Sequence, residues 1–260
     1  ASMTALFAAR LAQGGITGPE DPFTGVDGFC NLAGTFELSD IGAPMDGRSA
    51  IETTSYKFFP SEFNSQGPIT LLLEMRKEFA LDEIEKITIA SYHLTWHEIG
   101  GGQGDREDKW NPRTRESADH SLPYLAAVIL TDGELTLGSF AESRISDPAL
   151  RPLMNRIEVV EEQQYSDHWK AHSQPKSRID ITLKDGRTLS REVTNFRGHP
   201  KNSMSDDDIS HKFNGMIGLV ADRDAADRLL DQLWTLDKAR DLTGIAGLLS
   251  EWHVRGGGHD

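Results

Sequence analysis

Lys57 lies directly before two phenylalanines and a proline, Phe58, Phe59 and Pro60. The proline restrains the backbone at this point, and the aromatic rings can exclude water from the lysine ammonium group. An ammonium point charge in such a setting binds a carboxylate strongly. The pattern therefore makes Lys57 a candidate for holding a carboxylate. The structural alternative is a surface lysine whose stem covers the two rings.

His120 and Tyr124 are four residues apart. The segment 121–130 is typical of a buried helix, and residues at this spacing share a helix face. Both side chains can donate or accept a proton towards one ligand. Both residues are therefore candidates for acid–base chemistry. The alternative is that the tyrosine packs in the core with its hydroxyl group satisfied and the histidine caps the helix together with Asp119.

The loop before this helix carries two arginines, Arg113 and Arg115. Guanidinium groups bind carboxylates through paired hydrogen bonds, so both arginines are candidates for binding an anionic substrate. Arginines more often form ion pairs with nearby acids, and this loop offers Asp105, Glu107, Asp108 and Glu116. Both interpretations stay open.

Three polar residues follow Lys57 closely, namely Glu62, Asn64 and Gln66. At this distance along the chain they could line the same pocket as Lys57. Glu62 and Gln66 are therefore candidates for binding the substrate and for tuning the choice of substrate.

Other patterns have simpler explanations. His93 and His97 would fall on one face of an expected strand, but no third ligand accompanies them, so we predict a hydrogen-bonded pair and no metal site. The glycines of residues 100–104 lack the Lys-Ser/Thr ending of a phosphate-binding loop and indicate a flexible loop. Cys30 is the single cysteine, which excludes an intrachain disulfide and an iron–sulfur cluster.

The chain is acidic, with 41 acidic against 27 basic residues and a formal charge of −14. This balance argues against nucleic acid or an anionic membrane as a partner. The longest apolar stretches, such as residues 125–130, are far shorter than the ~20 residues of a membrane-spanning helix. No secretory signal can be recognised, so we expect a cytoplasmic protein.

The elements that must position these residues follow from hydrophobic periodicity and turn signals. Helices are expected over residues 3–11, 69–79, 121–130, 205–217, 222–236 and 242–251, and strands over 84–96, 156–161 and 177–193. Asp185 and Gly186 predict a type I′ turn that folds the last strand into a hairpin. This order indicates an α+β fold in which a helical domain, here partial, contains an inserted smaller α/β domain. The expected ranges are 1–40, 41–200 and 201–260, the last returning to the helical domain.

Three segments resemble the MmgE/PrpD family: residues 56–66 (YKFFPSEFNSQ), 112–124 (PRTRESADHSLPY) and 198–205 (GHPKNSMS). The form Lys-x-Phe-Pro-x-Glu-Phe-x-Ser-Gln is closer to 2-methylcitrate dehydratases than to the similar cis-aconitate decarboxylases. Tyr124 matches an active-site tyrosine of the family. The resemblance implies a cofactor-independent lyase of propionate metabolism that acts on a polycarboxylate.

The resemblance also implies that residues 41–200 form a lid-like domain and that the enzyme is a homodimer. A further catalytic histidine and an acidic residue would lie in an N-terminal half that precedes this sequence. The helical stripe at residues 3–11 begins without an N-cap, so we expect this chain to be the C-terminal part of a longer enzyme. A decarboxylase, an epimerase and a non-catalytic binding or assembly subunit remain alternatives.

Overall fold

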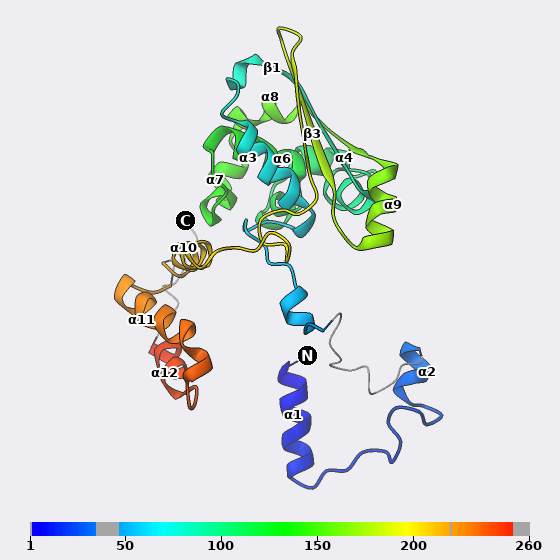
Figure 1. Ribbon diagram of the computed structural model, residues 1–260, viewed down its shortest axis with the longest axis vertical. Coiled ribbons are helices and arrows are strands. Elements are labelled where there is room, and N and C mark those ends of the chain that lie inside the picture. The colour runs from blue at the N-terminus through cyan, green and yellow to red at the C-terminus, as the bar shows by residue number, and fades with distance from the viewer. Residues whose placement is uncertain (1, 35–46, 219, 252–260) are drawn as a thin grey trace. The chain divides into compact units, whose positions relative to one another are not determined.

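The computed structural model describes residues 2–34, 47–218 and 220–251. It divides into two compact units, Ala1–Thr53 and Thr54–Asp260 (Figure 1). The expected domain boundary between residues 40 and 41 lies outside the described residues, and the boundary between residues 200 and 201 stays a prediction.

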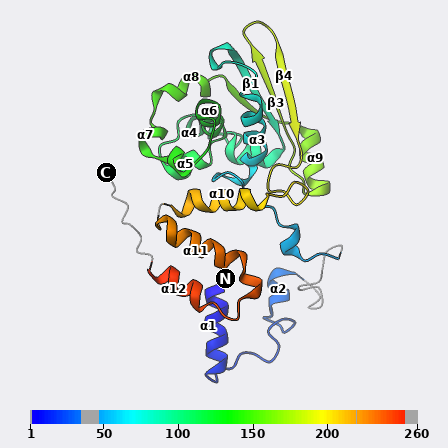
Figure 2. The ribbon, with the colours of Figure 1, turned by 60° about the vertical axis from the view of Figure 1, so that its left-hand side comes forward.

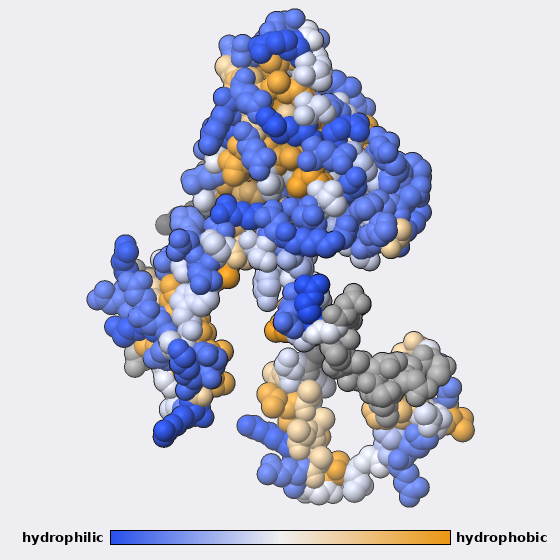
Figure 3. Space-filling model, viewed as in Figure 1, coloured by the Kyte–Doolittle hydropathy of each residue, from blue (hydrophilic) through white to orange (hydrophobic). Residues whose placement is uncertain are grey.

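The first unit contains helix α1 (Ser2–Gln13), helix α2 (Phe29–Ala33) and the 3-10 turn η2 (Ala50–Thr53). The helix expected from the apolar stripe at residues 3–11 is confirmed, and so is the loop that follows it. The apolar residues of this stripe are exposed, with 83% of Met3 and 61% of Phe7 accessible to solvent. Figure 3 shows hydrophobic residues at the surface of this unit and of the C-terminal helices.

The second unit contains a mixed sheet of four strands in the order β2-β1-β3-β4. Strand β1 (Ile84–Ser91) pairs in parallel with β2 (Ile157–Glu161) and antiparallel with β3 (Ser177–Leu183). Strand β4 (Thr188–Val193) completes the β3–β4 hairpin. The fold is therefore mixed α and β with a small mixed sheet, as the order of elements predicts.

The hairpin turn differs from the expected type I′. Gly186 N donates to Leu183 O at 2.9 Å and Leu183 N donates to Arg187 O at 2.8 Å. Gly186 has a φ of +88°, whereas Asp185 does not have a positive φ. The turn is a three-residue loop with glycine in the left-handed position. It forms because the Asp185 carboxylate accepts a hydrogen bond from Arg187 N, two residues later, at 3.0 Å.

One hydrophobic core joins the sheet to helix α3 (Gln66–Met75) and helix α6 (Leu122–Asp132). Every residue of α6 from Leu122 to Leu130 is buried. The helix begins at the Ser121 N-cap and ends at Gly133, which has a φ of +77° and donates to Ile129 O. The sequence signals for a buried helix ended by glycine are confirmed.

A second, smaller cluster lies on the opposite face of β1. Ile89 belongs to the main core, whereas Ala90 packs with Tyr92 and Tyr165, because alternate side chains of a strand point to opposite faces. Tyr165 belongs to helix α9 (Gln163–His172), which the sequence pattern did not predict. Figures 1 and 2 show α9 on one side of the sheet and α6 on the other.

Two more differences concern the segment after β1 and the loop before α6. The expected strand over residues 84–96 ends at Ser91, and the chain becomes helical from His93 through the π-helical turn η5 (Thr95–Ile99). The charged loop contains two short helices, α4 (Arg106–Trp110) and α5 (Arg115–Asp119). The remaining short elements are η3 (Phe63–Ser65), η4 (Leu81–Glu83), η6 (Leu137–Phe140), α7 (Glu142–Ile145), η7 (Pro148–Leu150), α8 (Arg151–Met154) and η8 (Leu236–Lys238).

The C-terminal part consists of helices α10 (Asp206–Ile217), α11 (Arg223–Trp234) and α12 (Thr243–Glu251), which confirms the expected ranges. Ser205 caps α10 through a hydrogen bond from Asp208 N to Ser205 Oγ at 3.2 Å. Within the described ranges, no helix combines the length and apolar character needed to cross a membrane.

Candidate active site

The loop that carries Lys57 is held in place by Gln66. Phe59 N donates to Gln66 Oε1 at 3.0 Å, and Gln66 Nε2 donates to Phe59 O at 3.2 Å and to Ser61 Oγ at 3.1 Å. Gln66 is fully buried, so its amide fixes the loop from inside. Lys57 itself is exposed. Gln66 therefore holds this loop in position, and its expected contact with substrate stays a prediction.

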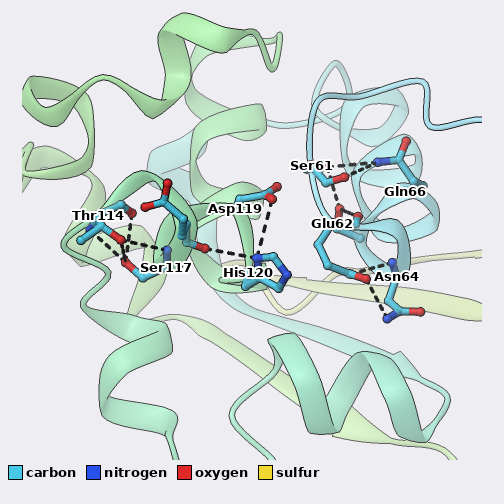
Figure 4. A network of polar contacts seen from close by, with 10 residues as sticks. Ser61, Glu62, Asn64, Gln66, Thr114, Ser117, Asp119 and His120 are labelled. Carbon is cyan, nitrogen blue, oxygen red and sulfur yellow. Dashed lines mark hydrogen bonds and ion pairs between the residues drawn. The ribbon is translucent and has the colours of Figure 1, made fainter. Parts of the chain in front are cut away.

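Glu62 and Glu98 form a carboxylate pair bridged by Asn64. Asn64 Nδ2 donates to Glu62 Oε1 at 2.9 Å and to Glu98 Oε2 at 3.1 Å. Asn64 N donates to the second Glu62 oxygen at 2.6 Å. The buried hydroxyl group of Tyr92 donates to Asn64 Oδ1, which fixes the orientation of the amide. The result is a rigid polar site at which both carboxylates are half-buried, and Figure 4 shows Glu62 and Asn64 within it.

The electrostatics of this site raise the pKa of Glu62. Burial raises the pKa of the Glu62 carboxyl group and the negative charge of Glu98 raises it further, against the hydrogen bond from Asn64 and the positive charges of His120 and Lys57. A raised pKa moves a carboxyl group towards the range in which it can donate a proton to a substrate. Burial also raises the pKa of Tyr92, so its hydroxyl group stays a hydrogen-bond donor.

His120 faces Glu62 across the site (Figure 4). It ends α5, with Nδ1 at 3.1 Å from Glu116 O and at 3.6 Å from the Asp119 carboxylate. A proton on Nδ1 donated to Glu116 O leaves Nε2 free to exchange a proton with a ligand. The fold thus brings Glu62, His120 and Lys57 close enough to interact. The sequence had indicated a shared pocket for Glu62 and Lys57, but not for His120.

Tyr124 lies elsewhere. The expected shared helix face with His120 is wrong, because α5 ends at His120 and α6 begins only after Ser121. Tyr124 is fully buried and its hydroxyl group donates to Ser139 O at 2.5 Å. Burial raises the pKa of Tyr124 to about 12. The proposed site does not include Tyr124, and its part in proton transfer stays a prediction of the resemblance alone.

Arg113 and Arg115 lie at the start of α5, and both are exposed. In the described part of the chain, neither guanidinium group forms an ion pair with the acids of the loop. Thr114, between them, caps α5 by accepting a hydrogen bond from Ser117 N at 3.2 Å. The two arginines are therefore available to a carboxylate ligand, which agrees with the substrate-binding interpretation without testing it.

His93 and His97 lie on a helical turn and not on a strand face. Their rings stack with centroids 5.0 Å apart, and His93 Nδ1 lies 3.1 Å from a carboxylate oxygen of Glu161. Across residues 2–34, 47–218 and 220–251, no group of three or more histidine, cysteine, aspartate or glutamate residues is arranged to hold a metal ion.

Sequence reasoning missed Tyr92 and Glu98. Tyr92 is 28 residues from Asn64 and Glu98 is 34 residues from it, so no local spacing links them. The only signal was that Glu98 closely follows the strand expected over residues 84–96, where loop residues often carry function, whereas Tyr92 lies inside that range.

The sequence of this chain was compared with known protein families. Residues 59–237 match the family described as MmgE/PrpD C-terminal domain. The chain belongs to the MmgE/PrpD family. The match covers α3, the sheet, α6 and the carboxylate pair, and it begins two residues after Lys57.

Relatives with two different activities are similar to this MmgE/PrpD chain. Human cis-aconitate decarboxylase is 28% identical over 138 residues, which cover 53% of this chain and 28% of the relative. The mitochondrial 2-methylcitrate dehydratase of Yarrowia lipolytica is 28% identical over 162 residues, 58% of this chain and 29% of the relative. The 2-methylcitrate dehydratase of Cupriavidus necator is 26% identical over 147 residues, covering 55% and 30%. The chain therefore spans less than a third of the length of these relatives.

Proposed function

We propose that this chain is the substrate-holding and proton-transferring part of a hydro-lyase that dehydrates 2-methylcitrate or a similar tricarboxylate without a metal. The observation that carries the proposal is the half-buried Glu62 carboxyl group, whose pKa is raised by burial and which interacts with both His120 and Lys57. The family relatives named 2-methylcitrate dehydratase support the reaction type.

Elimination of water needs a base, an acid and cations. A base removes the proton next to a carboxylate, the electron pair forms the double bond, and hydroxide leaves from the neighbouring carbon with a proton from an acid. In this proposal Lys57 holds a substrate carboxylate, and Arg113 and Arg115 contribute further cations. Protonated Glu62 gives its proton to the leaving hydroxide, and His120 returns the proton to it.

The main base would come from an N-terminal half of the enzyme. The chain covers less than a third of its relatives, which supports the view that more chain belongs to the working protein. On this proposal the α/β part is a lid-like domain inserted in a helical domain. The enzyme is a cytoplasmic homodimer that takes part in propionate metabolism and needs no cofactor.

A decarboxylase of cis-aconitate is the second candidate, because the human enzyme of that name is as similar to this chain as the dehydratases are. An epimerase of a polycarboxylate would use the same proton chemistry. The exposed apolar residues of α1 fit a third candidate, a non-catalytic subunit that docks on a partner.

The test uses the protein as isolated from its native source, with its intact mass measured first. The same sample is given 2-methylcitrate, with the conjugated alkene product followed by absorbance, and cis-aconitate, with carbon dioxide release followed. Alkene formation from 2-methylcitrate supports the dehydratase. Carbon dioxide release from cis-aconitate would overturn the dehydratase proposal in favour of a decarboxylase. The absence of both reactions would favour the non-catalytic docking subunit.

A further inference from the structure

A second lysine, Lys212, contacts the backbone carbonyl group of Lys57. Lys212 on α10 is 155 residues away in sequence, and its Nζ donates to Lys57 O and, at 3.4 Å, to Phe58 O. Its side chain is half-buried and lines a cavity of about 220 Å³ together with Phe58 and Met216. A charged group is costly in such a place unless its hydrogen bonds are made, and the two carbonyl groups make them.

The same short segment has two further ties to the chain just before α10. Tyr56 N donates to Gly198 O at 2.8 Å. The Arg197 guanidinium group lies 4.6 Å from the centroid of the Phe58 ring, and Arg197 Nε donates to Asp208 of α10 at 2.9 Å. The Tyr56–Phe58 segment is thus held against the start of the C-terminal helices, and Lys212 supplies the tie to the Lys57 carbonyl group itself.

We propose that Lys212 is a positioning residue that places Lys57 for carboxylate binding by clamping the carbonyl groups of residues 57 and 58 to α10. This inference rests on the proposed role of Lys57 in holding a substrate carboxylate. Hydrogen bonds from a charged donor are the strong ones, so an ammonium group holds the loop better than a neutral side chain would.

The charge of Lys212 has a second consequence. Burial and the nearby Lys57 ammonium group both lower the pKa of Lys212, so the two cations repel each other in the free protein. A carboxylate bound by Lys57 would weaken this repulsion, since it neutralises one of the two charges.

The first test measures the loop without any ligand. Hydrogen exchange is followed at the amides of Tyr56 and Phe59 in the whole chain, for wild type, Lys212→Met and Lys212→Arg. We expect exchange about tenfold faster in Lys212→Met, which corresponds to the loss of one charged hydrogen bond, and near wild-type exchange in Lys212→Arg. Lys238→Met is the control, because Lys238 is an exposed lysine in η8. Unchanged exchange in Lys212→Met would overturn the clamp.

The second test measures citrate binding by calorimetry in wild type, Lys57→Met, Lys212→Met and the double variant. If Lys212 acts through Lys57, Lys212→Met weakens citrate binding about tenfold in the wild-type background and leaves it unchanged in the Lys57→Met background. Equal losses in both backgrounds would show that Lys212 does not act through Lys57. Wild-type protein that binds no citrate would count against the proposed function, while the exchange experiment would still decide the clamp.

Discussion

Gly198 gives the sharpest stability prediction, because its conformation and its surroundings both exclude a side chain. Its φ is +101°, and a Cβ atom added there would lie 2.1 Å from Tyr56 O. Its own carbonyl group accepts the hydrogen bond from Tyr56 N. A Gly198→Ala substitution must therefore move the segment that leads into Lys57.

The cost has three parts. An alanine at positive φ costs about 1–2 kcal/mol, and the displaced Tyr56 N to Gly198 O hydrogen bond costs about 1 kcal/mol more. Alanine also makes the unfolded chain less flexible than glycine does, which offsets about 0.4–1 kcal/mol of this loss in stability. We expect a net loss of about 2 kcal/mol in the free energy of unfolding, measured by urea denaturation, and a fall in Tm of about 4–8 °C.

Gly186 is the matched control. It has a φ of +88° but no atom within 4 Å of an added Cβ, so Gly186→Ala carries the conformational cost alone and should lose about 1 kcal/mol or less. Only Gly198→Ala should also weaken citrate binding, because only Gly198 lies next to the Lys57 segment. Equal losses of stability in the two variants would refute the argument from close approach.

Three further predictions concern the site. Burial raises the pKa of Glu62 in the folded protein. The contribution of Glu62 to the free energy of unfolding is therefore fully present below the unfolded pKa of about 4.5. This contribution is lost as the pH rises through the folded pKa. Glu62→Gln should flatten that fall in urea denaturation, and an unchanged pH profile would count against the raised pKa. Tyr124→Phe should lower stability by about 1–3 kcal/mol by leaving the buried Ser139 carbonyl group unpaired; loss of turnover without loss of stability would instead restore Tyr124 to the site. Replacing Arg113 and Arg115 together by glutamine should weaken citrate binding about tenfold with stability changed by less than about 0.5 kcal/mol, and unchanged affinity would remove both from the substrate site.

Elements with strong local signals could be predicted from the sequence. The N-cap at Ser205, the left-handed Gly133 and the apolar run of α6 each specify a helix end or a buried helix through a few neighbouring residues. The β3–β4 hairpin was recognisable for the same reason, although its turn type depended on the Asp185 carboxylate.

The end of β1 could not be predicted, because tertiary contacts decide it. The segment after Ser91 has the β-branched and aromatic residues of a strand, yet it turns into a helix. Ser91 Oγ lies 2.9 Å from Thr95 Oγ1 and 2.8 Å from Ser177 Oγ of β3, so the hydroxyl groups tie the turn to the neighbouring strand. Strand propensity is a weak guide where such contacts compete.

The candidate site was only partly predictable. Lys57 and Glu62 are close in sequence, so a shared pocket was a local inference. The bridge from Asn64 to Glu98 and the hydrogen bond from Tyr92 join distant segments, which requires the fold. His120 was found by its residue type, but it lies across the site from Glu62 and does not share a helix with Tyr124.

The most direct test of the central claim is the rate of 2-methylcitrate dehydration by the native protein and by its Glu62→Gln and Lys57→Met variants, with Lys238→Met as the control. We predict turnover in wild type and control, and rates lower by at least about 100-fold in both site variants. Rates in Glu62→Gln and Lys57→Met within about twofold of an active wild type, a difference too small for a lost acid–base group, would contradict the account.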